Sequence, residues 1–283
     1  MNQPPPAPLA GDNHPRLWLG ALPRPNADDN KHTRGHALVV GGYPMTGAAR
    51  LAARGAARAG AGLTTIAVPA IAFPIYAAAV TSIMVQALAA PADLGHLLET
   101  QRFTALLIGP GAGSGEETRA RVLTLLRSGR ACVLDADALT SFQDQPVALA
   151  EAISGPCVLT PHDGEFARLF AVDGDRPTRA RAAAQRSGAV MVLKGSETVI
   201  AAQDGRTIIN RNAPPTLATA GTGDVLAGII LGLLAQGMDA FLAAAAGVWL
   251  HGAAASAFGP GLIADDLPEQ LPAVLRRLLT ESA

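Results

Sequence analysis

Short β-rich runs alternate with helix-compatible stretches along most of the chain, and this alternation limits the possible folds more than any other feature. Helix-compatible stretches separate most of the runs, for example 47–59, 116–128 and 177–187. Alternation repeated this often predicts an α/β fold with a mostly parallel central sheet and helices on both faces, in three layers. The runs are HALVVGG (36–42), LTTIAVP (63–69), ALLIGPG (105–111), CVLDAD (132–137), CVLTPH (157–162) and VMVLKG (190–195).

The two ends of the chain depart from this alternation. Residues 1–30 are rich in Pro, Asn and Asp and predict an N-terminal arm. No repeat or linker divides the remainder, so we expect 31–283 to form one domain. Near its end, ETVIAAQDGRTIIN (197–210) predicts a hairpin that turns at Asp204-Gly205. Three closing helices are expected over 223–236, 239–258 and 268–280.

Charge and composition limit the classes of partner. The chain has 22 basic and 23 acidic residues, a net charge of −1, so we expect a small-molecule partner and no nucleic acid. Cys132 and Cys157 lie in apolar runs, and no signal peptide is recognisable, which together predict a reduced cytoplasmic protein. The uncharged stretch 59–92 is interrupted by Pro, and 241–258 is built of Ala and Gly. We therefore predict no transmembrane segment and no membrane partner.

Nearly every β-rich run ends in residues suited to binding or catalysis. In an open parallel sheet, ligands bind at the carboxyl ends of the strands, so these turns predict a single long cleft. The turns are Gly41-Gly42, Gly109-Pro110-Gly111, Asp135-Ala136-Asp137, Pro161-His162 and Lys194-Gly195.

Two of these turns carry carboxylates whose role the residues alone leave open. Asp135 and Asp137 could reach a metal or a phosphate, or one of them could cap the following helix. His162 and Glu165 stand three apart at a predicted helix start and could share a face near the cleft. Glu165 could equally favour the helix dipole alone.

Lys194 is unusual for this chain. The sequence has 20 Arg and two Lys, Lys31 and Lys194, so its basic positions are overwhelmingly arginine. A lysine at a strand end indicates that a compact ammonium is required there.

The stretch ATAGTGDVLAGII (218–230) places small residues before a long apolar run. The first turn of a helix has backbone N–H groups without intrahelical acceptors, and without bulky side chains these groups can converge on an anion. Asp224 lies in that turn and could take a proton from a hydroxyl while the amides stabilise charge on a transferred phosphoryl group. A single GTGD is also compatible with a carboxylate that only complements the helix dipole.

Taken together, these segments resemble the ADP-dependent NAD(P)H-hydrate dehydratase family. The resemblance runs in family order from about Lys31 to Leu275. In chain order it rests on GGYPMTGAARLAARGAARAGAGL, IGPGAG, VLDADAL, VLTPHDGEFARLF, VLKGSETVIA, NAPPTLATAGTGDVLAGIILGLLAQGM, GVWLHGAAA and GPGLIADDLP. GTGD alone would indicate only the wider ribokinase-like superfamily. The resemblance therefore implies a ribokinase-like fold. Two positions depart from the family pattern: Asp163, where Pro is more frequent, and Gly42, where Ser is common.

The resemblance implies a cofactor-repair enzyme. Such enzymes restore NADH or NADPH from the hydrated forms NADHX and NADPHX at the expense of ADP or ATP, by phosphorylation of the ring hydroxyl and elimination of phosphate. The substrate-binding positions of the family fall on Ala48, Gly111, His162 and Asp224, and the nucleotide-binding positions on Lys194, Gly195, Ser196, Glu197, Thr198 and Gly223.

Catalytic roles follow from the resemblance and from the chemistry of the loop. Asp224 is expected to be the base, with the amides of Gly221, Thr222, Gly223 and Asp224 as the anion hole. Mg²⁺ is expected to be held, mostly through water, by Glu165 with Asp135 or Asp137. The resemblance further implies a homo-oligomer, with a tetramer suspected, and helix 47–59 could pack against a copy of itself. The arm is too short for an epimerase domain, so a separate epimerase chain is expected.

Other functions fit parts of the pattern. A ribokinase-like kinase for a vitamin precursor such as hydroxyethylthiazole would share the GTGD loop and stop at the phosphorylated product. A nicotinamide dehydrogenase is disfavoured, because GPGAGSG (109–115) lacks the glycine spacing of the dinucleotide fingerprint. A catalytically silent nucleotide-binding protein is disfavoured by the presence of Asp224.

Overall fold

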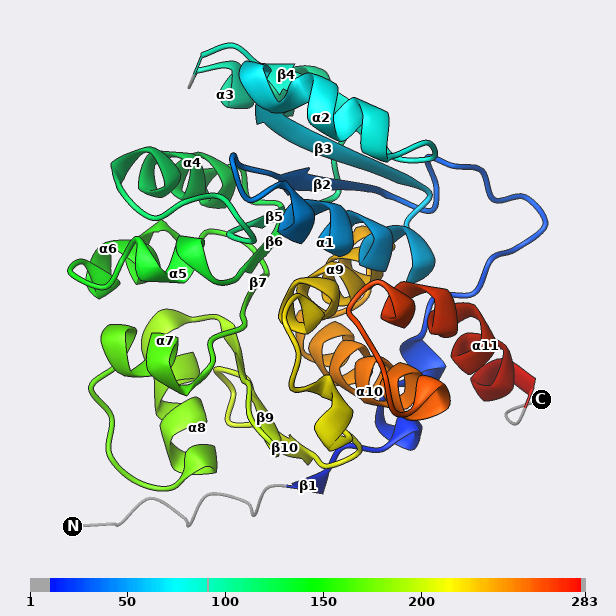
Figure 1. Ribbon diagram of the computed structural model, residues 1–283. Helices are drawn as coiled ribbons and strands as arrows, with labels where there is room; N and C mark the ends of the chain where they lie inside the picture. Colours follow the sequence, from blue (N-terminus) through cyan, green and yellow to red (C-terminus); the bar gives the residue numbers. More distant parts are fainter. Residues whose placement is uncertain (1–10, 91, 281–283) are drawn as a thin grey trace.

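The computed structural model describes residues 11–90 and 92–280, and within them one ten-stranded sheet runs through the molecule in the order β1-β10-β9-β8-β7-β6-β5-β2-β3-β4 (Figure 1). The strands are β1 Gly11–Asp12, β2 His36–Val40, β3 Leu63–Pro69, β4 Met84–Leu88, β5 Ala105–Ile108, β6 Ala131–Leu134, β7 Cys157–Leu159, β8 Val190–Leu193, β9 Thr198–Ala201 and β10 Thr207–Asn210. Only β9 runs antiparallel to its neighbours β8 and β10 in this part of the chain. The predicted mostly parallel sheet and its closing hairpin are confirmed.

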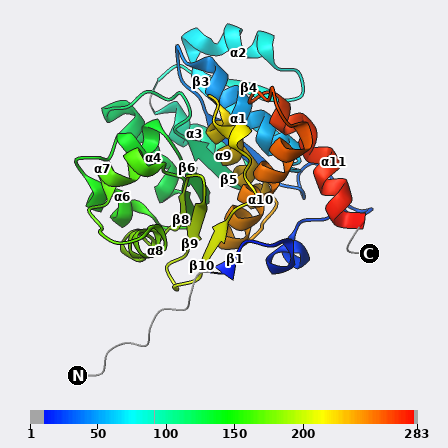
Figure 2. The same ribbon diagram turned by 60° about the horizontal axis from the view of Figure 1, so that its bottom comes forward.

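Helices cover both faces of the sheet, as predicted. Figures 1 and 2 show α1, α9, α10 and α11 on one side and α3 to α8 on the other, with α2 beside the edge strand β4. The helices are α1 Thr46–Arg58, α2 Phe73–Ala79, α3 Asp93–Thr100, α4 Glu116–Arg127, α5 Asp137–Thr140, α6 Pro146–Ala152, α7 Asp163–Leu169, α8 Arg176–Ser187, α9 Thr222–Ala235, α10 Ala240–Phe258 and α11 Asp266–Thr280.

The strands are buried on both faces because successive side chains point to opposite sides. In β2, Ala37 and Val39 join the apolar cluster under α1, α9 and α10, whereas Leu38 and Val40 join the cluster under α3 to α8. This explains why the parallel strands appear in the sequence as continuous apolar runs.

The segment that precedes β2 packs against the domain. β1 pairs with β10, and Trp18 is buried with its indole N–H donated to Asn13 Oδ1 at 3.2 Å. Asn13 in turn donates to Asn210 Oδ1 at 3.0 Å and to the Ala245 carbonyl at 2.8 Å. Residues 1–10 of the predicted arm lie outside the described residues.

Helix α10 is long and apolar enough to cross a membrane, and it is the one such helix among the residues described. In the fold, 72% of its most apolar window is buried, against α9, α11 and the sheet. Its apolar character is therefore used in internal packing, in agreement with the sequence interpretation.

Candidate active site

The amino end of α9 forms the centre of the candidate site. Gly221 precedes the helix in the left-handed conformation, with φ of +87°, and offers no side-chain cap. Thr222, Gly223 and Asp224 follow as the first helical residues, whose N–H groups have no intrahelical acceptor. Thr222 Oγ1 donates to the carbonyls of Leu217 and Thr219, at 3.0 and 3.1 Å, which closes the preceding loop against the helix. This geometry supports the anion hole predicted from the sequence.

Asp224 is held in a state suited to a base. Its pKa is raised to about 6, first by burial and then by the nearby carboxylate of Asp135, while the ammonium of Lys194 opposes the rise. A carboxylate with a pKa this high is a stronger proton acceptor than an exposed aspartate, and it is still largely ionised at neutral pH.

Lys194 links the two sides of the site. Its Nζ lies 2.7 Å from Asp135 Oδ1, and a Cβ added to Gly223 would lie 3.4 Å from the same nitrogen. Burial opposes the charge of Lys194, but Asp135 holds its pKa above the usual value, so the side chain stays an ammonium. The cation therefore lies beside the amides that would receive an anion.

A pocket of about 440 Å³ opens beside the amino end of α9. The β8–β9 turn forms one wall, and the loop that precedes α9, including the short 3₁₀ helix Pro215–Leu217, forms another. Of the predicted nucleotide-binding residues, the structure brings together at this pocket Lys194, Gly195, Ser196, Thr198 and Gly223. Glu197 lies in the same turn but does not line the pocket: its carboxylate pairs with Arg211 Nε at 2.8 Å.

His251 of α10 is a pocket residue that the sequence interpretation missed. It is buried, and its Nε2 lies 2.9 Å from the carbonyl of Thr222. Burial lowers its pKa to about 4, so the ring is neutral and donates its Nε2–H to that carbonyl. His251 therefore helps to hold the first turn of α9. The available signal was a single histidine within an otherwise uncharged, Ala-rich stretch.

Two predicted substrate-binding residues, Ala48 and Gly111, lie next to each other. Gly111 has φ of +66°, and a Cβ added to it would lie 3.4 Å from the Cβ of Ala48 and 2.3 Å from the carbonyl oxygen of Met45. A side chain at Gly111 would collide with this backbone. The glycine therefore lets the loop after β5 approach the start of α1.

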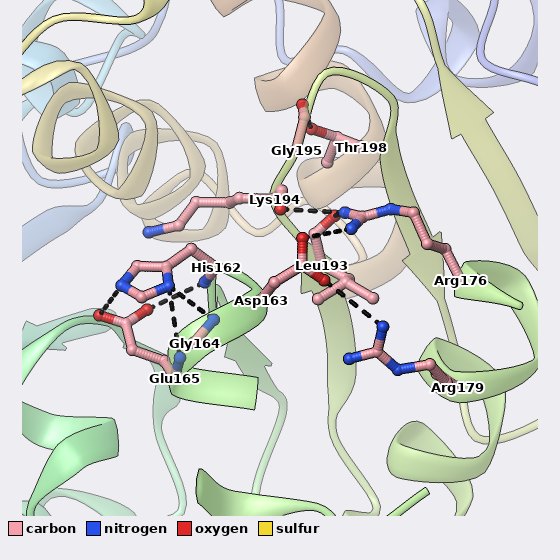
Figure 3. A network of polar contacts seen from close by, with 10 residues as sticks. All are labelled: His162, Asp163, Gly164, Glu165, Arg176, Arg179, Leu193, Lys194, Gly195 and Thr198. Carbon is pink, nitrogen blue, oxygen red and sulfur yellow. Dashed lines mark hydrogen bonds and ion pairs between the residues drawn. The ribbon is translucent and has the colours of Figure 1, made fainter. Parts of the chain in front are cut away.

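His162 and Glu165 form a reciprocal cap at the start of α7. His162 Nδ1 accepts from the N–H of Gly164 and of Glu165, and Glu165 Oε2 accepts from the N–H of His162 at 2.9 Å (Figure 3). The side chain of His162 remains 56% exposed, with its Nε2 3.4 Å from Glu165 Oε1. Glu165 therefore has a structural role as a cap of α7, and His162 stays accessible for a ligand.

The three predicted metal-binding carboxylates already have protein partners. Asp135 pairs with Lys194, Asp137 Oδ2 accepts from the N–H of Gly113 at 2.9 Å, and Glu165 caps α7. β6 ends at Leu134, so Asp135 and Asp137 do not continue a strand, and Asp137 begins α5. Within residues 11–90 and 92–280, no three His, Cys, Asp or Glu side chains are grouped to hold a metal. Carboxylate oxygens suit Mg²⁺ chemically, and water and phosphate oxygens would have to complete its coordination.

Comparisons with known proteins identify the family of the chain. The model of the NAD(P)H-hydrate dehydratase family matches residues 37–273. The ADP-dependent (S)-NAD(P)H-hydrate dehydratase of Xanthomonas campestris is 34% identical over 280 residues, which span 92% of this chain and 94% of that protein. The bifunctional NAD(P)H-hydrate repair enzyme Nnr of Salinibacter ruber is 40% identical over 92% of this chain, and the matched part is 51% of its length. The chain thus spans about half the length of such bifunctional relatives.

Solved structures indicate the same family. The ADP/ATP-dependent NAD(P)H-hydrate dehydratase of Bacillus subtilis, co-crystallised with ATP and Mg²⁺, superposes with a TM-score of 0.84 at 31% identity, over 95% of this chain and 99% of that one. A ribokinase-like superfamily protein from Enterococcus faecalis superposes with a TM-score of 0.81 at 25% identity, over 91% and 92% of the two chains. The ribokinase-like fold is thereby confirmed, and the chain belongs to the NAD(P)H-hydrate dehydratase family.

Proposed function

We propose that the protein is a hydro-lyase that dehydrates (S)-NADHX and (S)-NADPHX to NADH and NADPH, while ADP or ATP is converted to AMP or ADP and phosphate. The observation that carries this proposal is the position of Asp224. Its carboxylate, with a pKa near 6, lies in the same helix turn as the free amides and beside the Lys194 ammonium. The groups that we assign as base, anion hole and phosphate-binding cation thus lie close together.

The first half of the reaction follows kinase chemistry. Asp224 takes the proton of the ring hydroxyl as the hydroxyl oxygen attacks the terminal phosphorus of the nucleotide. The bond from that phosphorus to the bridging oxygen breaks, and its electron pair leaves with the nucleotide. The amides of Thr222, Gly223 and Asp224 and the Lys194 ammonium stabilise the charge on the transferred phosphoryl group.

The second half is an elimination. The carbon–oxygen bond breaks with its electron pair on phosphate, and loss of a proton from the neighbouring ring carbon forms the double bond of the reduced nicotinamide. Phosphorylation is needed because hydroxide is a poor leaving group and phosphate a good one. Mg²⁺ bound with the nucleotide would neutralise phosphate charge, with Asp135, Asp137 or Glu165 holding its water ligands.

The test is to incubate the protein with NADHX, Mg²⁺ and either ADP or ATP, and to follow the return of reduced-nicotinamide absorbance. We expect a return only with nucleotide and only before chelation of Mg²⁺ by EDTA. The faster donor identifies the preferred nucleotide. A vitamin-precursor kinase would instead phosphorylate an alcohol such as hydroxyethylthiazole and leave NADHX unchanged. The dehydratases among the relatives disfavour that alternative.

The cellular setting is part of the same proposal. Cys132 and Cys157 are buried free thiols on neighbouring strands, which suits a reducing cytoplasm. We propose a homo-oligomer, to be tested by light scattering. The Ala face of α1 is occupied by α9 of the same chain, so a second copy would use another surface. An epimerase acting beside the protein should complete the repair of a mixture of hydrate epimers, which the dehydratase alone would leave unfinished.

A further inference from the structure

Arg176, at the start of α8, holds the backbone at the end of β8. Its Nη2 donates to the carbonyls of Leu193 and Lys194, at 3.0 and 2.9 Å (Figure 3). Both carbonyls lie where β8 gives way to the turn that lines the pocket. One guanidinium nitrogen therefore fixes the orientation of two consecutive peptide groups.

The backbone of Lys194 is held from its other side as well. Its N–H donates to the carbonyl of Pro161 at 2.8 Å, and Lys194 forms an isolated parallel bridge with His162. Its side chain is fixed separately by Asp135. The position of Lys194 thus depends on the loop after β7, on Asp135 and on Arg176.

Asp163 pairs with the other terminal nitrogen of the same guanidinium. Its Oδ2 accepts from Arg176 Nη1, and its Oδ1 lies 3.5 Å from Arg179 Nη1. Asp163 is the first residue of α7 and directly follows His162. The Asp163–Arg176 pair therefore connects the helix that presents His162 to the turn that presents Lys194, and the charge of Arg176 is balanced within the protein.

Gly195 is shaped to accept this guanidinium. Its backbone does not have the positive φ that would by itself favour glycine, but a Cβ added to it would lie 2.5 Å from Arg176 Nη2. The missing side chain provides the space in which the guanidinium packs on the turn. Arg176 and the turn thus pack closely against each other.

We propose that Asp163 and Arg176 are positioning residues for the nucleotide, which hold the Lys194–Ser196 turn in its binding conformation without touching the phosphates. The inference rests on the proposed function, in which the pocket beside this turn holds the nucleoside diphosphate or triphosphate. It gives a role to Asp163, one of the two positions at which the sequence departs from the pattern of the family that it resembles.

The test compares Arg176→Lys and Asp163→Asn with the control Arg179→Lys. Lysine keeps the charge but cannot donate to two carbonyls and a carboxylate in the guanidinium geometry. Arg179 shares Asp163 and packs on the Phe166 ring, with its guanidinium carbon 4.8 Å from the ring centroid, but neither hydrogen bond to the turn comes from it. Binding of a fluorescent ADP analogue is measured directly, together with KM for nucleotide, KM for hydrate, kcat and the melting temperature.

We expect the Kd and KM for nucleotide to rise roughly tenfold in Arg176→Lys and about threefold in Asp163→Asn, with KM for the hydrate changed less than about twofold. Arg179→Lys should leave all three constants within about twofold of wild type. Asp163 is half exposed, so the Asn variant is expected to fold even if Arg176→Lys does not.

Two outcomes would overturn the proposal. Unchanged nucleotide affinity in both Arg176→Lys and Asp163→Asn would mean that the turn keeps its conformation unaided. Tighter binding in Asp163→Asn would mean that Arg176, once released, binds phosphate itself. If the wild-type protein binds the analogue but does not convert NADHX, the proposed function fails, while the positioning role of Asp163 and Arg176 is still tested by the binding constants.

Discussion

The two faces of the sheet are packed by different means. On the α1, α9 and α10 side, glycine lets helix backbones touch: a Cβ added to Gly228 of α9 would lie 2.0 Å from the carbonyl oxygen of Ala52 in α1, and one added to Gly232 would lie 2.4 Å from that of Ala56. On the α3 to α8 side, large side chains such as Leu125, Phe142 and Phe166 fill the space between helix and sheet.

This difference separates the parts of the site. The amino end of α9, with its amides and Asp224, is set by close backbone contacts that leave little freedom. His162 is held by hydrogen bonds at the amino end of α7, a seven-residue helix on the other face. Lys194, at the end of β8, is likewise held by a hydrogen bond, from Arg176 to its carbonyl. The turn proposed as the anion hole is therefore the more rigid side of the site, and the loops opposite it are held by polar contacts.

The largest expected effect is on chemistry at the rigid side. Asp224→Asn keeps the shape of the side chain and removes its basicity, so kcat should fall roughly 10²- to 10⁴-fold. In the wild-type protein, activity should rise as the pH passes about 6, because the base must be ionised. A steady-state pH profile checks both statements. Retained turnover in the Asn variant would remove Asp224 from its assigned role.

The next effect tests the close packing itself. Gly228→Ala places a methyl group against the Ala52 carbonyl, and a backbone atom cannot move aside as a side chain can. We expect the free energy of unfolding to fall by about 3 kcal/mol, as measured by denaturant titration. A loss below about 0.5 kcal/mol would show that α1 and α9 can separate easily, and the contrast between the two faces would disappear.

Helix–helix contacts of this kind could not be predicted from the sequence, although most of the strands and long helices could. The buried parallel strands appear as continuous apolar runs, and all six were placed, together with the hairpin and the closing helices. β4 (Met84–Leu88) was missed because it is a partly exposed edge strand with little β-branched character. The short helix α6 contains too few residues to show a helical period, whereas the start of α7 was predicted at His162 and a helix after Asp135 was one of the alternatives.

Some residues of the candidate site could be predicted from the sequence and others could not. Residues that act through local backbone conformation, such as Gly221 and Asp224, could be predicted because their turn is continuous in the sequence. His251 and Arg176 act on residues 29 and 18 positions away, and nothing near them in the sequence indicates the partner. Glu197 shows the converse, since a position predicted to bind nucleotide pairs with Arg211 instead of lining the pocket. Its role stays a prediction.

Asp224→Asn also tests the energetic cost of the rigid side. A carboxyl whose folded pKa lies above its unfolded value contributes stability that is fully present below the unfolded value and is lost as the pH rises through about 6. The ionised base therefore destabilises the fold at neutral pH. We expect the Asn variant to gain about 1–3 kcal/mol at pH 8 and nothing below pH ~3.8. An equal difference at both pH values would mean that the cause is not ionisation.

Gly95→Ala should have the opposite sign to Gly228→Ala. Gly95 lies within α3 on the other face, and a Cβ added to it would meet no atom within 4 Å. Alanine favours the helical backbone without a collision, so stability should increase by about 0.5–1 kcal/mol. The same chemical change would then stabilise one layer and destabilise the other. Destabilisation by both substitutions would show that the two layers are equally intolerant of added volume.

The smallest effect is expected where the rigid layer meets solvent. Arg54 of α1 pairs with Asp265 at 3.0 Å and with Glu269 at 2.9 Å beside and within α11, and all three side chains are exposed. Exposed pairs contribute little, so Arg54→Gln should cost about 0.2–1 kcal/mol, and less in high salt. Arg50→Gln is the control, since Arg50 donates to the Thr46 carbonyl of its own helix. A larger, salt-independent loss at Arg54 would mean that charge, as well as backbone contact, holds α1 in place beside α9.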